Sequence, residues 1–180
     1  MAERNLNIIL SGFGGQGLLF AGKIIAQAGL IEDRQVSWLP SYGPEMRGGT
    51  ANCSVVLQDD PIGSPLVTQP DVLIAMNLPS VTKFLDDVKP GGLVLIDSSL
   101  VPEIPERDDV RVIPVPSTEL AERHGFKTLS NVILTGKLFA ETHFCAQESI
   151  EEAVRRVVPA GKRAKLLQPN LDALAVGMAQ

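Results

Sequence analysis

Two short runs of almost unbroken apolar residues constrain the fold of this chain more than any other feature. They cover residues 71–76 and 93–97, and between them lie the helical pattern 78–88 and the turn 89–92. Continuous apolar runs of this length are typical of strands that are buried on both faces. Two successive strand and helix units of this kind predict an α/β fold with a mostly parallel sheet that helices cover on both sides.

The rest of the chain fits the same fold class. Further strands are predicted at 6–10, 35–40, 51–57 and 110–115, and helices at 18–28, 117–124, 131–142 and 148–158. We expect strand 51–57 to expose one face, Ser117-Thr118-Glu119 to cap the helix 117–124, and a last amphipathic stretch after Pro159 and Gly161. Because 180 residues suffice for one full core but not for two, one domain spanning residues 1–180 is expected.

The charge balance argues against a nucleic-acid partner. The chain has 16 Lys and Arg against 21 Asp and Glu, a formal net charge of -5, whereas nucleic-acid binding depends on clustered basic residues. The one locally basic segment alternates with apolar residues in a helical pattern and is interpreted as a solvated helix face. It contains Arg155, Arg156, Lys162, Arg163 and Lys165.

The cysteines and the N-terminal segment bear on cofactors and location. Cys53 and Cys145 lie far apart, so they form neither a CxxC pair nor a ligand set for zinc or an iron–sulfur cluster, and no metal is expected in this chain. Lone cysteines fit a reducing compartment. Since no secretory signal or membrane span is apparent, we expect a cytoplasmic protein with no membrane contact.

A glycine loop follows the first predicted strand. Gly12, Gly14 and Gly17, with Gly15 and Gln16 between them, satisfy the GxGxxG spacing, in which backbone amides at a helix start can face an anion. The loop could contact a phosphate-bearing ligand or a neighbouring subunit, or could serve only the close packing of strand and helix. A dinucleotide is disfavoured because strand 35–40 does not end in the acid that grips the ribose, and Glu32 and Asp33 come too early.

A second loop has unusual chemistry for a connector. Residues 40–50 combine two prolines and three glycines with a tyrosine, an acid and a base, which indicates a shaped surface rather than a loose one. Its candidate residues are Tyr42, Gly43, Glu45, Arg47, Gly48, Gly49 and Thr50. The alternative is that Glu45 and Arg47 are only a solvated pair.

Polar residues also follow the two buried strands. Asn77, Asp97 and Ser98 lie where parallel strands end, the edge at which open α/β sheets bind ligands, although Asp97 and Ser98 are equally explained as turn formers. His124 and His143 end predicted helices, where a histidine complements the helix dipole, and no triad is indicated. No catalytic residue is therefore identified, and the chain is expected to be one part of a larger catalyst.

Several of these segments together resemble one family. The glycine loop, residues 39–54, the motif Ile62-Gly63-Ser64-Pro65, and residues 70–75 and 89–93 are similar to the gamma subunit of 2-oxoacid:ferredoxin oxidoreductases. The resemblance continues to Asn131 and residues 170–177 and is nearest to the 2-oxoglutarate enzyme, with pyruvate, branched-chain and indolepyruvate relatives as alternatives. It implies a three-layer α/β/α, Rossmann-like domain with a mostly parallel sheet.

The resemblance also implies a function. Such complexes oxidatively decarboxylate a 2-oxoacid with CoA to acyl-CoA and CO2 and reduce ferredoxin. Thiamine diphosphate, Mg2+ and iron–sulfur clusters are expected on the alpha, beta and delta-type partner subunits. This chain would carry no redox centre and would contribute to assembly and to the CoA and substrate side of the site. A free-standing NAD-dependent dehydrogenase and a scaffolding subunit without a ligand remain as alternatives.

The two loops and Asn77 are the expected ligand- or subunit-facing surface. Its residues are Gly12, Gly14, Gly15, Gln16, Gly17, Tyr42, Gly43, Glu45, Arg47, Gly48, Gly49, Thr50 and Asn77. Arg47 would face an anion, because a guanidinium forks onto carboxylate or phosphate. We expect Arg47→Ala to leave the subunit folded while lowering assembly or CoA-dependent turnover.

Overall fold

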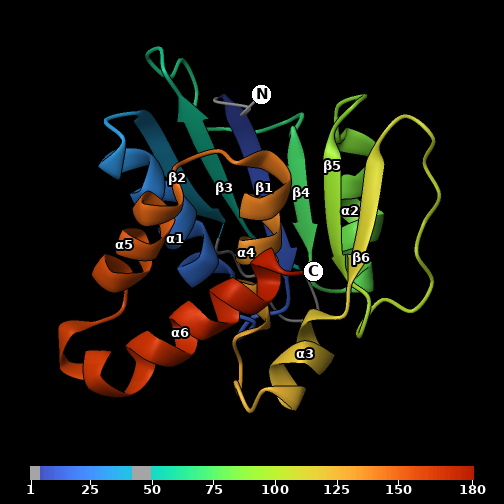
Figure 1. Cartoon of the computed structure of the whole chain (residues 1–180). Helices are drawn as coiled ribbons and strands as arrows, with labels where there is room; N and C mark the ends of the chain where they lie inside the picture. Colours follow the sequence, from blue (N-terminus) through green and yellow to red (C-terminus); the bar gives the residue numbers. More distant parts are fainter. Residues whose placement is uncertain (1–4, 42–49) are drawn as a thin grey trace.

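The computed structural model describes residues 5–41 and 50–180 (Figure 1). Its elements are β1 (Leu6–Gly12), α1 (Leu18–Ile31), β2 (Gln35–Ser41), β3 (Ala51–Gln58), β4 (Val72–Ala75), α2 (Leu78–Phe84), the 3-10 helix η2 (Leu85–Asp87), β5 (Leu93–Asp97), β6 (Arg111–Val115), α3 (Ser117–Arg123), α4 (Ser130–Thr142), α5 (Gln147–Val157), the 3-10 helix η3 (Ala160–Lys162) and α6 (Arg163–Met178). Each strand and helix expected from the sequence is present near its predicted position.

The strands form one sheet in the order β2-β3-β1-β4-β5-β6. Strands β1, β4, β5 and β6 pair in parallel, whereas β3 runs antiparallel to both of its neighbours, β1 and β2. Five of the six strands therefore point the same way, and the expected α/β fold with a mostly parallel sheet is confirmed, with β3 as the exception. The chain can return directly from β2 to β3 because antiparallel neighbours need no crossover helix.

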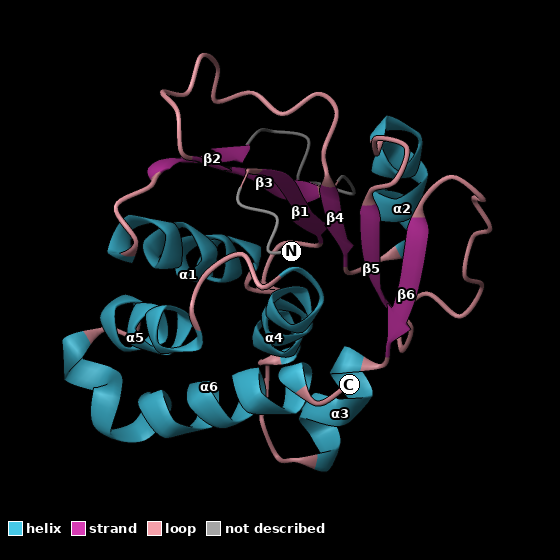
Figure 2. Ribbon diagram, turned by 45° about the horizontal axis from the view of Figure 1, so that its top comes forward, coloured by secondary structure: helices cyan, strands magenta, loops and turns pink. Residues whose placement is uncertain are grey.

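Helices cover both faces of the sheet, which gives three layers, with more helices on one face than on the other (Figure 2). Helices α1 and α4 pack on one face, α5 packs on α1 and α6 packs on α4, while α2 covers the opposite face. The alternation of β1 supplies both layers, since Ile8 and Leu10 belong to the apolar cluster under α1 and Ile9 belongs to the cluster under α2. This arrangement fixes where the loops after β1 and β4 lie.

Two local expectations have different outcomes. In β3, Cys53 and Val55 are buried while Asn52 and Ser54 on the other face are half-buried, but Val56 on that second face is also buried, so the expected exposure of one face is found only in part. The expected cap of α3 is wrong. Ser117 is the first helical residue, Pro116 is the N-cap, and no side chain of that turn caps the helix.

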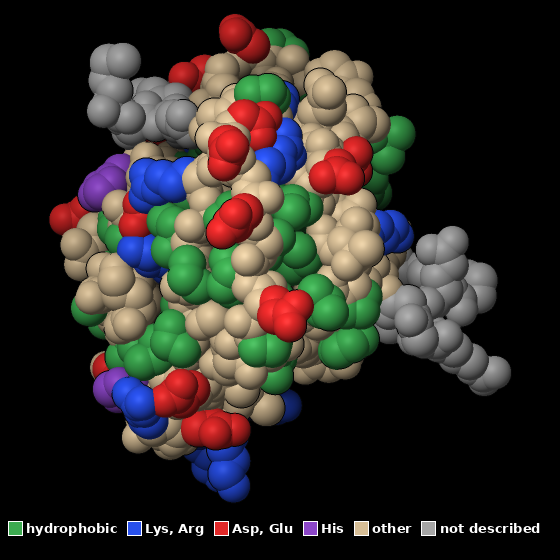
Figure 3. All heavy atoms as spheres, turned by 90° about the vertical axis from the view of Figure 1, so that its right-hand side faces the viewer, with side chains coloured by type: hydrophobic (Ala, Val, Ile, Leu, Met, Phe, Trp, Pro, Cys, Tyr) green, Lys and Arg blue, Asp and Glu red, His purple; other side chains and the backbone are tan. Residues whose placement is uncertain are grey.

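The edge strand β6 carries features that discourage pairing with another chain. The Arg111 amide donates to the Gly92 carbonyl, on the side of β5. Because backbone N–H groups point alternately to the two sides of a strand, the backbone nitrogens of Val112 and Pro114 face the free edge. Pro114 has no N–H to offer a further strand. Figure 3 shows acidic side chains scattered among apolar ones on this side of the molecule.

No helix in the described ranges is long and apolar enough to cross a membrane.

Candidate functional site

The glycine loop is held in shape by Gln16. The Gln16 side chain accepts a hydrogen bond from the Phe13 amide at 2.6 Å and donates one to the Met76 carbonyl at 3.2 Å. Gly12 ends β1, and a Cβ at that position would collide with the Gln16 amide oxygen and approach the Met76 Cβ at 3.1 Å. The loop is therefore fastened across the carboxyl ends of β1 and β4.

Gly17 joins the start of α1 to the start of α4. The side-chain amide of Asn131, in the first turn of α4, donates to the Gly17 carbonyl at 2.9 Å. Gly17 has φ +75, and a Cβ there would lie 2.5 Å from the donating nitrogen of Asn131. Neither α1 nor α4 has a side-chain cap at its start. Two helix N-termini, each with a partial positive charge, thus lie next to one another.

Thr50 and Asn77 flank the same loop. Thr50 precedes β3, whose first residue Ala51 pairs with Gly12, and Asn77 follows Met76 at the end of β4. The Asn77 side chain caps α2 by accepting from the Ser80 amide at 2.8 Å. Within the described part of the chain, the Asn77 amide nitrogen and the Thr50 hydroxyl are buried without a hydrogen-bond partner.

The structure accordingly gathers one group of the expected residues at a single edge of the sheet. They are Gly12, Gly14, Gly15, Gln16, Gly17, Thr50 and Asn77. The other expected residues lie outside the described ranges. They are Tyr42, Gly43, Glu45, Arg47, Gly48 and Gly49.

A cavity of about 450 Å³ opens beside the glycine loop, between α1, α4 and α6. It is lined by Gly15, Gly17, Phe20, Gly125, Phe126, Lys127, Thr128, Leu129, Asn131, Leu166, Pro169 and Asn170. The lining residues from α4, α6 and the loop before α4 were not among the site residues expected from the sequence. In the sequence, these segments are marked only by an asparagine inside each helical pattern, Asn131 and Asn170. The packing of the helices brings them to the glycine loop.

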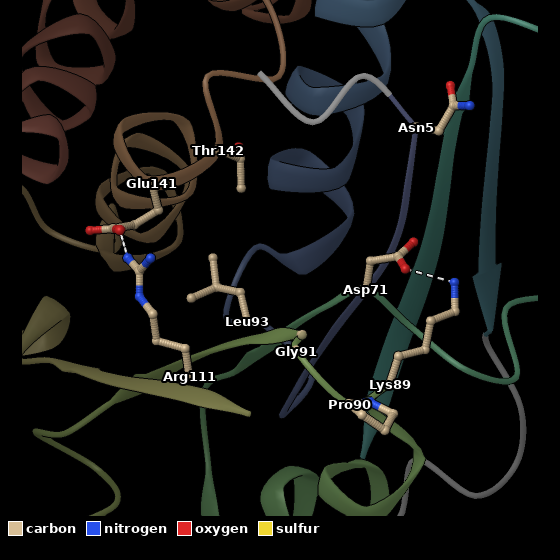
Figure 4. A pocket seen from close by; sticks show the side chains of 10 residues that line it. Asn5, Asp71, Lys89, Pro90, Gly91, Leu93, Arg111, Glu141 and Thr142 are labelled. Carbon is tan, nitrogen blue, oxygen red and sulfur yellow. Dashed lines mark hydrogen bonds and ion pairs between the residues drawn. The ribbon is translucent and has the colours of Figure 1, made fainter. Parts of the chain in front are cut away.

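A second hollow, of about 530 Å³, lies at the opposite edge of the sheet (Figure 4). Its charged side chains pair with one another: Lys89 Nζ lies 2.6 Å from Asp71 Oδ1, and Glu141 binds both Arg111 and Lys137. Burial, and secondarily the charge of Arg111, lower the pKa of Lys137. Since the charges that line this hollow are already paired, it is a weaker candidate for a ligand than the cavity at the glycine loop.

Asp97 has a structural role. It is fully buried and accepts hydrogen bonds from the Ser99 amide at 3.1 Å, the Thr118 amide at 3.3 Å and the Thr118 hydroxyl at 2.5 Å. Its carboxylate therefore forms the turn after β5 and satisfies the first turn of α3, which favours the turn-former interpretation. His124 and His143 are the C-caps of α3 and α4, as expected.

The two cysteines are buried thiols. Burial raises the pKa of Cys53 to about 12 and that of Cys145 to about 12, so both stay protonated at neutral pH. Neither has the low pKa of a nucleophile. In residues 5–41 and 50–180, no three His, Cys, Asp or Glu side chains are grouped so that they could hold a metal ion.

The fold and the site define a class of protein: an α/β domain that presents a glycine loop and two adjoining helix N-termini at the carboxyl edge of its sheet. Comparison with known sequences gives the family. The profile of the pyruvate ferredoxin/flavodoxin oxidoreductase family matches residues 7–180, and the chain belongs to this family. The resemblance to gamma subunits of 2-oxoacid:ferredoxin oxidoreductases is thereby confirmed.

Two curated relatives and one solved structure illustrate the similarity. Ketoisovalerate oxidoreductase subunit VorA of Methanothermobacter marburgensis is 40% identical over 97% of this chain, which spans only 36% of VorA. The 2-oxoglutarate synthase subunit KorC of Methanocaldococcus jannaschii is 39% identical over 89% of this chain and 87% of KorC. The gamma subunit of the keto/oxoacid ferredoxin oxidoreductase from Geobacter sulfurreducens PCA superposes with a TM-score of 0.84 at 32% identity, over 97% of this chain and 95% of that one.

Proposed function

We propose that this chain is a separate gamma subunit, one domain over residues 1–180, of a cytoplasmic 2-oxoacid:ferredoxin oxidoreductase. The observation that carries the proposal is the agreement with KorC and with the solved gamma subunit over nearly the full length of those proteins. The complex would decarboxylate 2-oxoglutarate with CoA to succinyl-CoA and CO2 and reduce ferredoxin. Thiamine diphosphate, Mg2+ and iron–sulfur clusters would reside on the alpha, beta and delta-type subunits.

Within such a complex the glycine loop edge would face the companion subunits and the path of CoA. Gly14 and Gly15 of the loop are exposed there, and Phe13 and Leu78 are large apolar side chains exposed at the same edge, whereas Asn77 is buried beneath it. Exposed apolar side chains next to polar groups are typical of a surface that a partner covers. Assembly and CoA binding would then depend on one continuous surface.

The alternative of a free-standing NAD-dependent dehydrogenase is disfavoured by the sheet order. In the dinucleotide fold the ribose acid ends the strand that adjoins β1, whereas here β3 separates β2 from β1. An acid at the end of β2 would not lie beside the glycine loop. If the purified chain reduced NAD with a 2-hydroxy acid, this alternative would replace the proposal.

Reconstitution tests the proposal directly. The companion subunits, assayed with and without this chain, should reduce ferredoxin with 2-oxoglutarate and CoA only when the chain is present. Gln16→Ala should lower CoA-dependent turnover because the loop loses its hydrogen bond to the Met76 carbonyl after β4. Gln35→Ala, at an exposed position of β2, should not lower it. Full turnover without the chain would reject the role.

The similarity to VorA supports a second substrate. A branched-chain 2-oxoacid such as ketoisovalerate should therefore be assayed beside 2-oxoglutarate and pyruvate. A higher kcat/KM for ketoisovalerate would reassign the substrate without changing the proposed subunit role.

A further inference from the structure

The hollow of about 530 Å³ at the amino ends of β4, β5 and β6 has two ion pairs on opposite sides (Figure 4). Lys89 pairs with Asp71 on one side, and Arg111 pairs with Glu141 on the other. The described charged residues of the lining are therefore two cations and two anions. A simple anion is a poor ligand here because both carboxylates repel it, whereas a ligand that carries both signs of charge finds a partner for each.

Both carboxylates keep a second partner if their cations turn to a ligand. Glu141 also binds Lys137, whose side chain is only 10% exposed, and Asp71 Oδ2 also accepts from the Asn7 amide at 2.7 Å. In each pair the cation is the more exposed member, and the Arg111 side chain is 60% exposed against 17% for Glu141. The cations can therefore contact a ligand without leaving a half-buried carboxylate unpaired.

The lining has unused hydrogen-bonding capacity for both charges of such a ligand. A guanidinium has five N–H donors in a fork that matches a carboxylate, so Arg111 can bind a second carboxylate beside Glu141. A carboxylate has about four acceptor positions, and Asp71 can accept from an ammonium group in addition to Lys89 and the Asn7 amide.

The space between the two ion pairs suits a small molecule. Gly91 lines it without a side chain, and a Cβ on Gly91 would meet nothing within 4 Å. Pro90 and Leu93 add apolar surface to the same lining. We propose that this hollow binds a free α-amino acid, with its carboxylate on Arg111, its ammonium group on Asp71 and its side chain against Pro90 and Leu93.

Calorimetric titration of the full chain with L-valine and L-glutamate tests the proposal. These probes are the amino counterparts of ketoisovalerate and 2-oxoglutarate, and both carry the α-ammonium and α-carboxylate groups that the hollow requires. One of them should saturate the chain, and the tighter ligand identifies the side chain that fits. The inference does not depend on the proposed subunit role, because the described residues of this chain alone build the hollow.

Analogues that lack one charge separate the two halves of the site. Ketoisovalerate is valine without the ammonium group, and isobutylamine is valine without the carboxylate. The corresponding analogues of glutamate are 2-oxoglutarate and γ-aminobutyrate. Each should bind at least roughly tenfold more weakly than its amino acid, because one charged group of the hollow loses its partner.

Arg111→Gln tests the carboxylate contact, with Arg123→Gln as its control. The Arg111 variant should bind the amino acid roughly tenfold more weakly with little change in melting temperature, because Glu141 keeps Lys137 as its partner. An arginine with only a structural role would change the melting temperature and leave the affinity unchanged. Arg123 pairs with Glu119 on α3 and does not line the hollow, so its variant should bind normally.

Asp71→Asn tests the ammonium contact, with Asp109→Asn as its control. The Asp71 variant should weaken valine binding and leave the weak binding of ketoisovalerate unchanged, since ketoisovalerate has no ammonium group. Asp109 pairs with Arg107 outside the hollow, so its variant should behave like the unmodified chain.

Three results would overturn the proposal. They are that neither amino acid saturates the chain, that the analogues bind as tightly as the amino acids, or that Arg111→Gln binds normally. A reconstituted complex that does not need this chain, together with normal amino-acid binding, would reject only the subunit role.

Discussion

At the scale of single residues, Gly15 and Gly17 of the glycine loop require glycine for different reasons. Gly15 and Gly17 both have positive φ, at +90 and +75. A Cβ on Gly15 would meet nothing within 4 Å, whereas one on Gly17 would lie 2.5 Å from the Asn131 amide. Gly15 thus needs only conformational freedom, and Gly17 also needs space.

This difference predicts two unequal losses of stability. Gly15→Ala should lower the free energy of unfolding by about 1–2 kcal/mol because of its backbone conformation alone. Gly17→Ala should lose about 1–3 kcal/mol more, because its methyl group also displaces Asn131. Urea denaturation of both variants measures the difference, and equal losses would mean that the contact with Asn131 does not constrain the loop.

At the scale of elements, α4 and α6 cross at two glycines. A Cβ on Gly136 would collide with the Leu174 carbonyl oxygen, and one on Gly177 would collide with the Ile133 carbonyl oxygen. The two helices can approach this closely only because both positions lack a side chain. Since α4 supplies Asn131 and α6 supplies Asn170, this crossing also sets the width of the cavity.

Gly136→Ala should therefore separate α4 from α6. We expect a loss of about 1–3 kcal/mol in the free energy of unfolding from overpacking, although alanine favours helix formation elsewhere. Gly161→Ala is the matched control, because nothing lies within 4 Å of its Cβ. Thermal unfolding followed by circular dichroism compares the two. A Gly136→Ala variant as stable as the Gly161→Ala control would contradict the close crossing.

At the scale of the whole molecule, the helical layer covers two thiols that stay protonated well above neutral pH. Cys53 lies on β3 with its sulfur 3.6 Å from the Leu18 carbonyl oxygen, and Cys145 precedes α5. Burial is the main cause that raises the pKa of each thiol from 9.0 to about 12. Folding and thiol ionisation are therefore linked at alkaline pH.

The sign of this linkage follows from the raised pKa. The thiols contribute fully to stability below pH 9.0, and the contribution is lost as the pH rises toward about 12, because only the unfolded chain ionises in that window. The free energy of unfolding should fall over this range, and less steeply in Cys53→Ala. Urea denaturation at a series of pH values tests this, and parallel curves for the two proteins would exclude Cys53 as a contributor.

The order of the strands and helices along the chain, the fold class, the glycine loop and the family were all predictable from the amino-acid sequence. These features are recorded in local periodicity and short motifs, because a residue's neighbours along the chain fix which of its faces is buried. The helix ends at His124 and His143 were predictable for the same reason.

Which of these elements contact one another depends on the packing of the whole chain. This packing places β3 between β1 and β2, gives the first turn of α3 the carboxylate of Asp97, and brings Asn131 and Asn170 to the glycine loop. Gly17 and Asn131 are 114 positions apart, and no local pattern encodes a contact across that separation. Such contacts arise because several helices must pack together on one face of a sheet, which is a property of the whole core.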